Sequence, residues 1–260
     1  SKLPPDTGGK VLASNDPISL TFACALLFAG IHVFIGHLRG LHGQQRSGWL
    51  SFSGGVAVTY VFLHVLPSLT EHNEILAHDN PSLEWLADHI VYLLALMGLI
   101  TFYGLDRTVT ASRRTQLAAT GVDEAHNTVF WVHIGAFAVY NFLIGYLLLN
   151  REDHSLQALA LYAVAMGLHF LTGDYGLFDH HKKLYQSRVR WIVAVALLAG
   201  WATGALIELH DPTISIIFGF LAGSVIMNVI KEELPEDRES RFLPFALGAA
   251  VYAVIVLVAD

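Results

Sequence analysis

Long apolar stretches without a charged side chain alternate with short polar segments along the whole chain. Stretches that contain no Asp, Glu, Lys or Arg span residues 18–38, 47–70, 89–105, 125–150, 154–173, 191–207, 212–230 and 242–259. Each is close to the ~17–25 residues that a helix needs to cross the hydrocarbon core of a bilayer. A transmembrane barrel would instead show ~10-residue segments of alternating polarity. Because a backbone in lipid must satisfy its hydrogen bonds internally, the pattern predicts membrane-spanning helices.

The predicted fold is therefore all-α and integral to the membrane, with eight transmembrane helices in one polytopic domain over residues 1–260. The expected spans are 18–38, 49–70, 85–105, 127–149, 155–177, 191–208, 213–232 and 242–259. The polar, Ala/Thr-rich segment 105–127 is expected to form a mobile cytoplasmic loop. Pro67 and Pro235 are expected to end helices, because proline restricts the residue before it and interrupts helical bonding.

The basic residues predict the orientation of these helices. Twelve of the 15 Lys and Arg residues lie in the first, third, fifth and seventh gaps between the apolar stretches. By the positive-inside rule those gaps are cytoplasmic, so both termini are expected on the outer or periplasmic side of a cell (inner) membrane. The net charge of −7 is unlike that of a nucleic-acid-binding protein. The expected partners are the lipid bilayer and a transported cation, and a homodimer is left open.

An internal repeat links the second and seventh spans. Phe52, Gly55 and Pro67 lie at the same relative spacing as Phe220, Gly223 and Pro235, and a Val and a Leu between them also coincide. The charge rule makes these two spans antiparallel, which predicts an inverted repeat of spans 1–3 and 6–8, as in many secondary transporters. Chance similarity between two apolar helices is the competing explanation.

Polar side chains inside the spans are the candidate functional residues, because such groups are costly in lipid unless they pair or line a cavity. The candidates for binding a transported ion are on the fourth and fifth spans: His133, Tyr140, Asn141, His169 and Asp174. His169 with Asp174 is the preferred pair. The entrance candidates are His64, Asn228 and Glu232. A lone histidine in an apolar helix is more often a hydrogen-bonded structural residue, and this alternative is kept for His32, His37 and His133.

Two further features of the sequence concern metal binding and catalysis. Asp179, His180 and His181 precede Lys182 and Lys183 in a predicted cytoplasmic segment, where they form either a metal-binding cluster or a solvated loop. The chain contains no H-E-x-x-H or G-x-S-x-G pattern, and its one cysteine, Cys24, lies within an apolar span. The sequence therefore predicts a protein that is not an enzyme.

The eight spans and the paired glycine-to-proline helices resemble the Zrt/Irt-like (ZIP) divalent metal transporters. The matching segments run from Ala222 to Pro235 and Glu236 in span seven, and from Gly54 to Pro67 in span two. The family carries a His-Asn-x-x-carboxylate-Gly pattern on its fourth helix. Here that segment reads Tyr140-Asn141-Phe142-Leu143-Ile144-Gly145, and on the fifth helix His169 fits while Asp174 lies one residue beyond the expected carboxylate.

The resemblance implies a ZIP-like bundle that transports a divalent metal ion or another cation, with an altered site on helices four and five. Zinc, iron or manganese is the implied ion, since imidazole and carboxylate groups suit these metals. A proton-linked variant is also expected to be feasible, because histidine titrates near neutral pH. The alternative is a transport-inactive protein that serves as a sensor, partner subunit or structural membrane protein, which the missing ligands favour.

Overall fold

A computed structural model describes six parts of the chain. They cover residues 17–35, 48–79, 86–151, 154–180, 185–233 and 241–259, and within them no residue forms a strand. The long helices are α1 (Pro17–Phe34), α2 (Gly48–Tyr60), α3 (Leu66–Asp79), α4 (Ile90–Thr120), α5 (Asn127–Leu149), α6 (Leu156–His180), α8 (Arg190–Leu206), α9 (Asp211–Glu233) and α10 (Phe242–Ala259). Every predicted span contains at least one of these helices, so the expected all-helical fold is confirmed.

The helices have the length and surface of an integral membrane protein. Six helical segments are long and apolar enough to cross a membrane: Gly48–Ala77, Ile90–Thr120, Asn127–Leu149, Leu156–Asp174, Tyr185–Leu206 and Asp211–Lys231. Two shorter apolar helices, Ile18–Phe34 and Phe242–Val258, flank them in the sequence. Large apolar side chains face outward on these two helices, including Leu27 at 54% and Leu257 at 73% exposure. Such a continuous apolar exterior fits a lipid environment.

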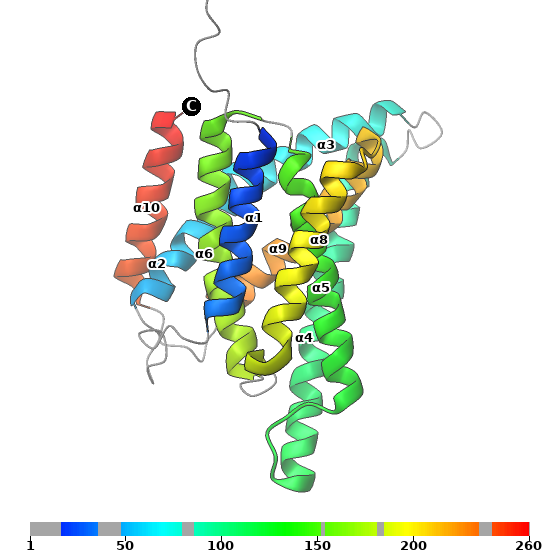
Figure 1. The fold of residues 1–260 in the computed structure, drawn as a ribbon, viewed down its shortest axis with the longest axis vertical. Helices are drawn as coiled ribbons and strands as arrows, with labels where there is room; N and C mark the ends of the chain where they lie inside the picture. The colour runs from blue at the N-terminus through cyan, green and yellow to red at the C-terminus, as the bar shows by residue number, and fades with distance from the viewer. Residues whose placement is uncertain are drawn as a thin grey trace, which may run out of the picture.

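The helices form one bundle whose two ends differ (Figure 1). We call the upper end the one at which α10 finishes, and the lower end the one at which α4 finishes. Helix α1 begins at the upper end, α2 leads upward into α3, and α9 descends, so α2 and α9 run in opposite directions. The second half of α4 projects beyond the other helices at the lower end.

The expectation of a mobile loop over residues 105–127 is wrong. Helix α4 continues through this segment to Thr120 and ends at Gly121, whose φ of 72° is left-handed and whose N–H bonds the carbonyl of Leu117. The segment from 105 to 120 contains no glycine or proline, and it includes three Ala and three Arg residues, which favour helix. An ion pair between Arg113 and Asp123, with 2.6 Å between Nη2 and Oδ2, then ties the turn back to the helix.

Pro67 does not end its helix, contrary to the prediction. Between α2 and α3 the chain forms one π-helical segment, η3 (Val61–Val65), and the N–H of Leu66 bonds the carbonyl of Val61. Proline has no N–H to donate, and a local change to π geometry lets the helix continue around the missing bond. Helix α3 then turns across the upper end of the bundle (Figure 1). Pro235 lies outside the described residues.

Three pairs of helices approach each other through glycines. A Cβ atom at Gly145 of α5 would overlap the carbonyl of Leu197 in α8, and one at Gly200 of α8 would overlap the carbonyl of Phe142 in α5. The same reciprocal relation joins Gly98 and Gly223 of α4 and α9, and Gly55 and Gly248 of α2 and α10. Since apolar side chains gain little from leaving lipid, close packing through small residues is a main source of helix association in membranes.

Candidate functional site

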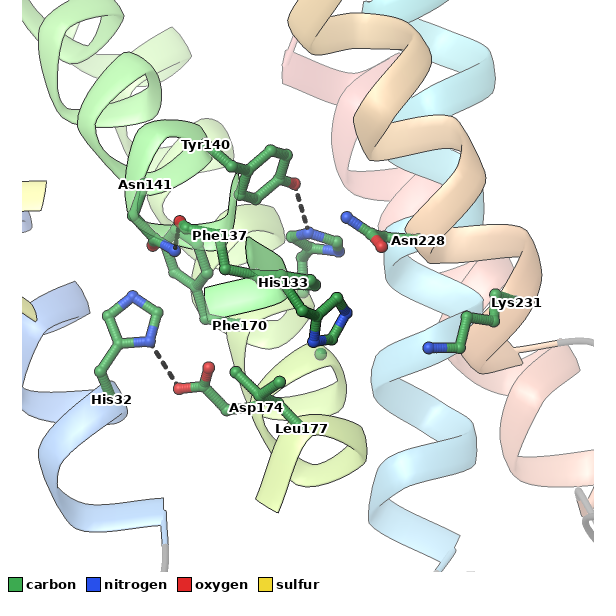
Figure 2. Close-up of a pocket in the computed structure, with 12 residues that line it drawn as sticks. His32, His133, Phe137, Tyr140, Asn141, Phe170, Asp174, Leu177, Asn228 and Lys231 are labelled. Carbon is green, nitrogen blue, oxygen red and sulfur yellow. Dashed lines mark hydrogen bonds and ion pairs between the residues drawn. The ribbon is translucent and has the colours of Figure 1, made fainter. Parts of the chain in front are cut away.

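A small polar cavity lies where α1, α5, α6 and α9 meet (Figure 2). Its lining consists of His32, His133, Phe137, Tyr140, Asn141, His169, Phe170, Gly173, Asp174, Leu177, Asn228 and Lys231. The volume open to the centre of a water molecule is about 20 Å³. A space of this size holds one water molecule or one ion stripped of most of its water.

One side of the cavity is formed by a buried histidine–carboxylate pair. Nδ1 of His32 lies 2.5 Å from Oδ2 of Asp174, and the two residues are 1% and 6% exposed. The carboxylate accepts the hydrogen bond from the ring, and the hydroxyl of Tyr185 donates to the backbone carbonyl of His32 at 3.1 Å. The pair links α1 to α6 across 142 residues of sequence. These bonds fix the orientation of the His32 ring and of the Asp174 carboxylate.

The opposite side of the cavity carries a second buried pair. The hydroxyl of Tyr140 and Nε2 of His169 are 2.9 Å apart, which joins α5 to α6. Next to Tyr140, the amide nitrogen of Asn141 donates to the carbonyl of Phe137 one turn earlier, at 2.9 Å. This bond turns the amide group so that its oxygen remains available. Figure 2 shows both pairs, with Asn228 and Lys231 approaching from α9.

Three buried polar atoms of the cavity lining have no hydrogen-bond partner among the described residues. They are Nε2 of His32, Oδ1 of Asn141 and Nδ1 of His169. Leaving one such group without a partner costs about 1–3 kcal/mol, so buried polar atoms are almost always bonded to protein, water or an ion. The three atoms belong to α1, α5 and α6, and all three residues line the same cavity. The lining is therefore built for a polar occupant.

The residues do not form a ready-made metal site in this conformation. Within the described residues no group of three or more His, Cys, Asp or Glu side chains is arranged to hold a metal ion. The ring of Phe170 lies 4.6 Å from that of His32 and 5.9 Å from that of His169, measured between centroids. Asp174 is already bonded to His32. A zinc ion needs about four N, S or O donors, so a metal would require these side chains to rearrange.

The five predicted ion-binding residues, His133, Tyr140, Asn141, His169 and Asp174, all line this one cavity. Asn228, predicted at an entrance, lines it too. His169 and Asp174 do not pair with each other, since each bonds a residue of another helix. His64 lies instead in a separate cavity at the upper end. The side chains of Glu232, Asp179 and His180 and the whole of His181 lie outside the described residues.

Two polar lining residues, His32 and Lys231, were not among the predicted site residues. His32 was interpreted as a structural histidine, and it is hydrogen-bonded, but its partner is the candidate carboxylate Asp174. The ammonium group of Lys231 lies 2.7 Å from Oδ1 of Asp106 on α4. Both lie near the lower ends of their helices. The sequence shows that both are polar residues within or beside an apolar stretch, but it does not show which residues they bond.

Two wide cavities open at the upper end of the bundle. Their volumes are about 650 and 770 Å³, and both are lined by His72, Asn150, Arg151 and His154. We call the two cavities together the upper vestibule. His64, Tyr60 and Tyr162 line the cavity of about 650 Å³. Ring contacts then lead from Tyr162 to Phe28 at 6.3 Å and from Phe28 to Phe170 at 5.2 Å. Since Phe170 lines the polar cavity, this aromatic series separates the vestibule from it.

The chain matches no protein-family model, and no curated protein matches it. The chemistry of the cavity is therefore the basis for assigning a role.

Proposed function

We propose that this protein is a membrane transporter of ZIP-like architecture that moves a cation through the polar cavity between α1, α5, α6 and α9. The observation that carries the proposal is the set of three buried polar atoms on His32, Asn141 and His169, which lack partners around one cavity inside an apolar bundle. Polar groups at such a depth are costly, and they mark ion and substrate pathways in membrane proteins.

The donors suit a small cation. Two imidazole nitrogens and an amide oxygen supply lone pairs, and the carboxylate of Asp174 supplies negative charge. A histidine that ligates a metal commonly donates its other ring N–H to a carboxylate, which is how His32 is held by Asp174. Imidazole and carboxylate together suit zinc, iron or manganese. Movement of Phe170 away from between the two rings would bring these donors to one ion.

Helix packing supports the proposed inverted repeat. In the alignment of span two with span seven, Gly55 corresponds to Gly223 and Phe52 corresponds to Phe220. Gly55 packs on the carbonyl of Phe245 in α10, and Gly223 packs on the carbonyl of Ala95 in α4. In the same way, the carbonyls of Phe52 and Phe220 meet Gly248 and Gly98. Residues aligned in sequence thus make corresponding helix crossings, as repeats of opposite orientation do in transporters.

The charge distribution supports an outward direction for the upper vestibule. Among the described residues, the upper end carries Arg151 alone, whereas the lower parts of the bundle carry Arg107, Arg113, Arg114, Arg188, Arg190, Lys231 and Arg241. By the positive-inside rule the lower end is cytoplasmic. An ion would then enter from the vestibule, pass the series Tyr162–Phe28–Phe170, and occupy the cavity. The ion pair of Lys231 with Asp106 closes the cytoplasmic side and must open for release.

A second candidate is a ZIP-like protein that no longer transports and acts as a sensor, partner subunit or structural protein. It is favoured by the lack of a group of three metal-binding side chains within the described residues. Ion flux separates the two candidates, since only a transporter moves the ion across a sealed membrane.

Uptake into proteoliposomes tests the proposed function. We expect vesicles that contain the protein to accumulate Zn²⁺, Fe²⁺ or Mn²⁺, measured with an enclosed metal-sensitive dye, while a pH dye reports any proton movement. His169→Ala removes a buried donor of the cavity and is expected to lower the uptake rate about 10- to 100-fold. The matched control is His210→Ala, because His210 is exposed and lies between α8 and α9, away from the cavity.

Two results would contradict transport through this cavity. One is normal uptake by both His169→Ala and Asp174→Ala. The other is the absence of metal and proton flux under every gradient, in which case a pull-down of partner proteins would support the non-transporting candidate.

A further inference from the structure

The upper vestibule contains a concentration of hydrogen-bond donors that the proposed cation path does not use. Arg151 follows the end of α5 and lines both cavities of the vestibule, where it is the one Lys or Arg residue among the described lining residues. It is half-buried, and its guanidinium carbon lies 5.8 Å above the ring of Tyr162. A positive charge at this depth needs an explanation in a protein expected to attract cations.

A structural role accounts for only part of Arg151. Its Nε donates to the carbonyl of Leu148 at 3.2 Å, which satisfies one free carbonyl at the end of α5. A cation is also favoured at a helix C-terminus. The two terminal nitrogens carry four further N–H groups in a planar fork, which matches the oxygens of a carboxylate or phosphate. No carboxylate of the described residues forms an ion pair with Arg151.

Two tyrosines line the same part of the vestibule as this guanidinium group. Tyr60 and Tyr162 line the same cavity, and their rings are 6.2 Å apart in an edge-to-face arrangement. Within the described residues their contacts are with other rings, Tyr162 also packing on Phe28. Three side chains with N–H or O–H donors, from α2, α6 and the end of α5, thus line one cavity.

We infer that the upper vestibule binds a small oxyanion, a carboxylate or phosphate group, on Arg151, Tyr60 and Tyr162. Charged hydrogen bonds from a guanidinium fork are the strongest that a side chain offers to such a group. The vestibule volumes lie in the usual range for ligand pockets, about 300–1,000 Å³. The inference does not depend on transport through the polar cavity, because the upper vestibule and the polar cavity have no lining residue in common.

The acidic residues of the vestibule restrict what can carry the oxyanion. Glu71, Glu208 and Asp211 also line it, and all three are exposed, whereas Arg151 is half-buried. His64, His72 and His154 add imidazole rings to the lining. A ligand therefore meets acidic groups at the rim and the donor group deeper inside. This order of charges favours one anionic group anchored at Arg151 over a ligand that is anionic along its length.

Binding measurements on the full chain test the inference. Isothermal titration of the purified protein with inorganic phosphate and with succinate examines soluble ligands. Nanodiscs of phosphatidylcholine with and without phosphatidylglycerol, followed by native mass spectrometry, examine a lipid phosphate. We expect Arg151→Gln to weaken binding about tenfold or more, Tyr162→Phe to weaken it less, and Arg151→Lys to retain part of it. The control Arg107→Gln, exposed on α4, should bind as the wild type does.

Each outcome decides the inference. Phosphate or succinate binding that Arg151→Gln loses supports a soluble oxyanion, and retention of phosphatidylglycerol alone, lost in the same variant, supports a lipid phosphate. Binding that Arg151→Gln leaves unchanged, or no binding of any of the three probes, overturns it. The thermal unfolding midpoint shows whether each variant is folded, and His169→Ala should still bind the oxyanion even though it transports poorly.

Discussion

Gly145→Leu is expected to leave almost no folded protein. A Cβ atom at Gly145 would overlap the backbone carbonyl of Leu197, so α5 and α8 would have to separate along their whole contact. Overpacking usually costs about 1–3 kcal/mol when side chains can shift, and a larger cost is expected where a backbone must move. The measurement is the yield of monodisperse protein in detergent and its thermal unfolding midpoint. The chain's single cysteine, Cys24, is half-buried and reports unfolding through a thiol-reactive dye.

Gly135→Leu is the matched control on the same helix. Nothing lies within 4 Å of a Cβ atom at Gly135, and leucine favours helix more than glycine does. This variant should therefore fold with a normal or slightly higher midpoint. Equal yields and midpoints for the two variants would show that α5 and α8 do not pack as described.

The second large effect concerns the pair of His32 and Asp174. We expect His32→Ala to destabilise the protein more than Asp174→Ala does. Without His32, a buried carboxylate loses its partner, which typically costs 3–5 kcal/mol, about the largest penalty for one side chain. Without Asp174, the histidine is stable as a neutral ring, and one N–H lacks an acceptor at a cost of about 1–3 kcal/mol. Asp174→Asn should cost least, because an amide oxygen still accepts from the ring.

A double-mutant cycle measures the pair directly. The destabilisation of His32→Ala with Asp174→Ala together should be smaller than the sum of the two single values, because the double variant leaves neither group alone. The cycle needs the unfolding midpoints of the wild type, the two single variants and the double variant, all measured in one detergent. An additive double variant would mean that the two side chains do not interact. Asp88→Asn, on an exposed carboxylate, is the control for charge removal and should leave the midpoint unchanged.

Most of the helical fold followed from the distribution of charge. A stretch without charge that is long enough to cross a bilayer can satisfy its backbone in lipid only as a helix, so the helices other than α4 were predicted close to where they lie. The errors arose where this rule says nothing. The segment after Leu105 carries charge, so the rule does not mark it as helix, although its Ala and Arg residues favour helix. At Pro67 the loss of one hydrogen bond was compensated by the π segment Val61–Val65.

The glycine crossings were visible in part. Gly200 and Gly204 on α8, and Gly219 and Gly223 on α9, lie four residues apart, a spacing that often marks a packing face in membrane helices. That spacing does not name the partner helix. Only the structure shows that Gly200 packs on Phe142 and Gly223 on Ala95.

The sequence by itself determined which residues are expensive to bury, and hence which helices are apolar enough to cross a membrane and which polar side chains need a partner. Only the tertiary structure decided the partners: Asp174 bonds His32 of α1 rather than acting with His169, and Lys231 bonds Asp106. The physical reason is that the free-energy cost of burying a polar side chain depends on that residue and its local segment. Which partner it bonds depends on how helices far apart in the chain rotate and approach each other. That rotation is fixed by glycine contacts between helices, which no single helix specifies.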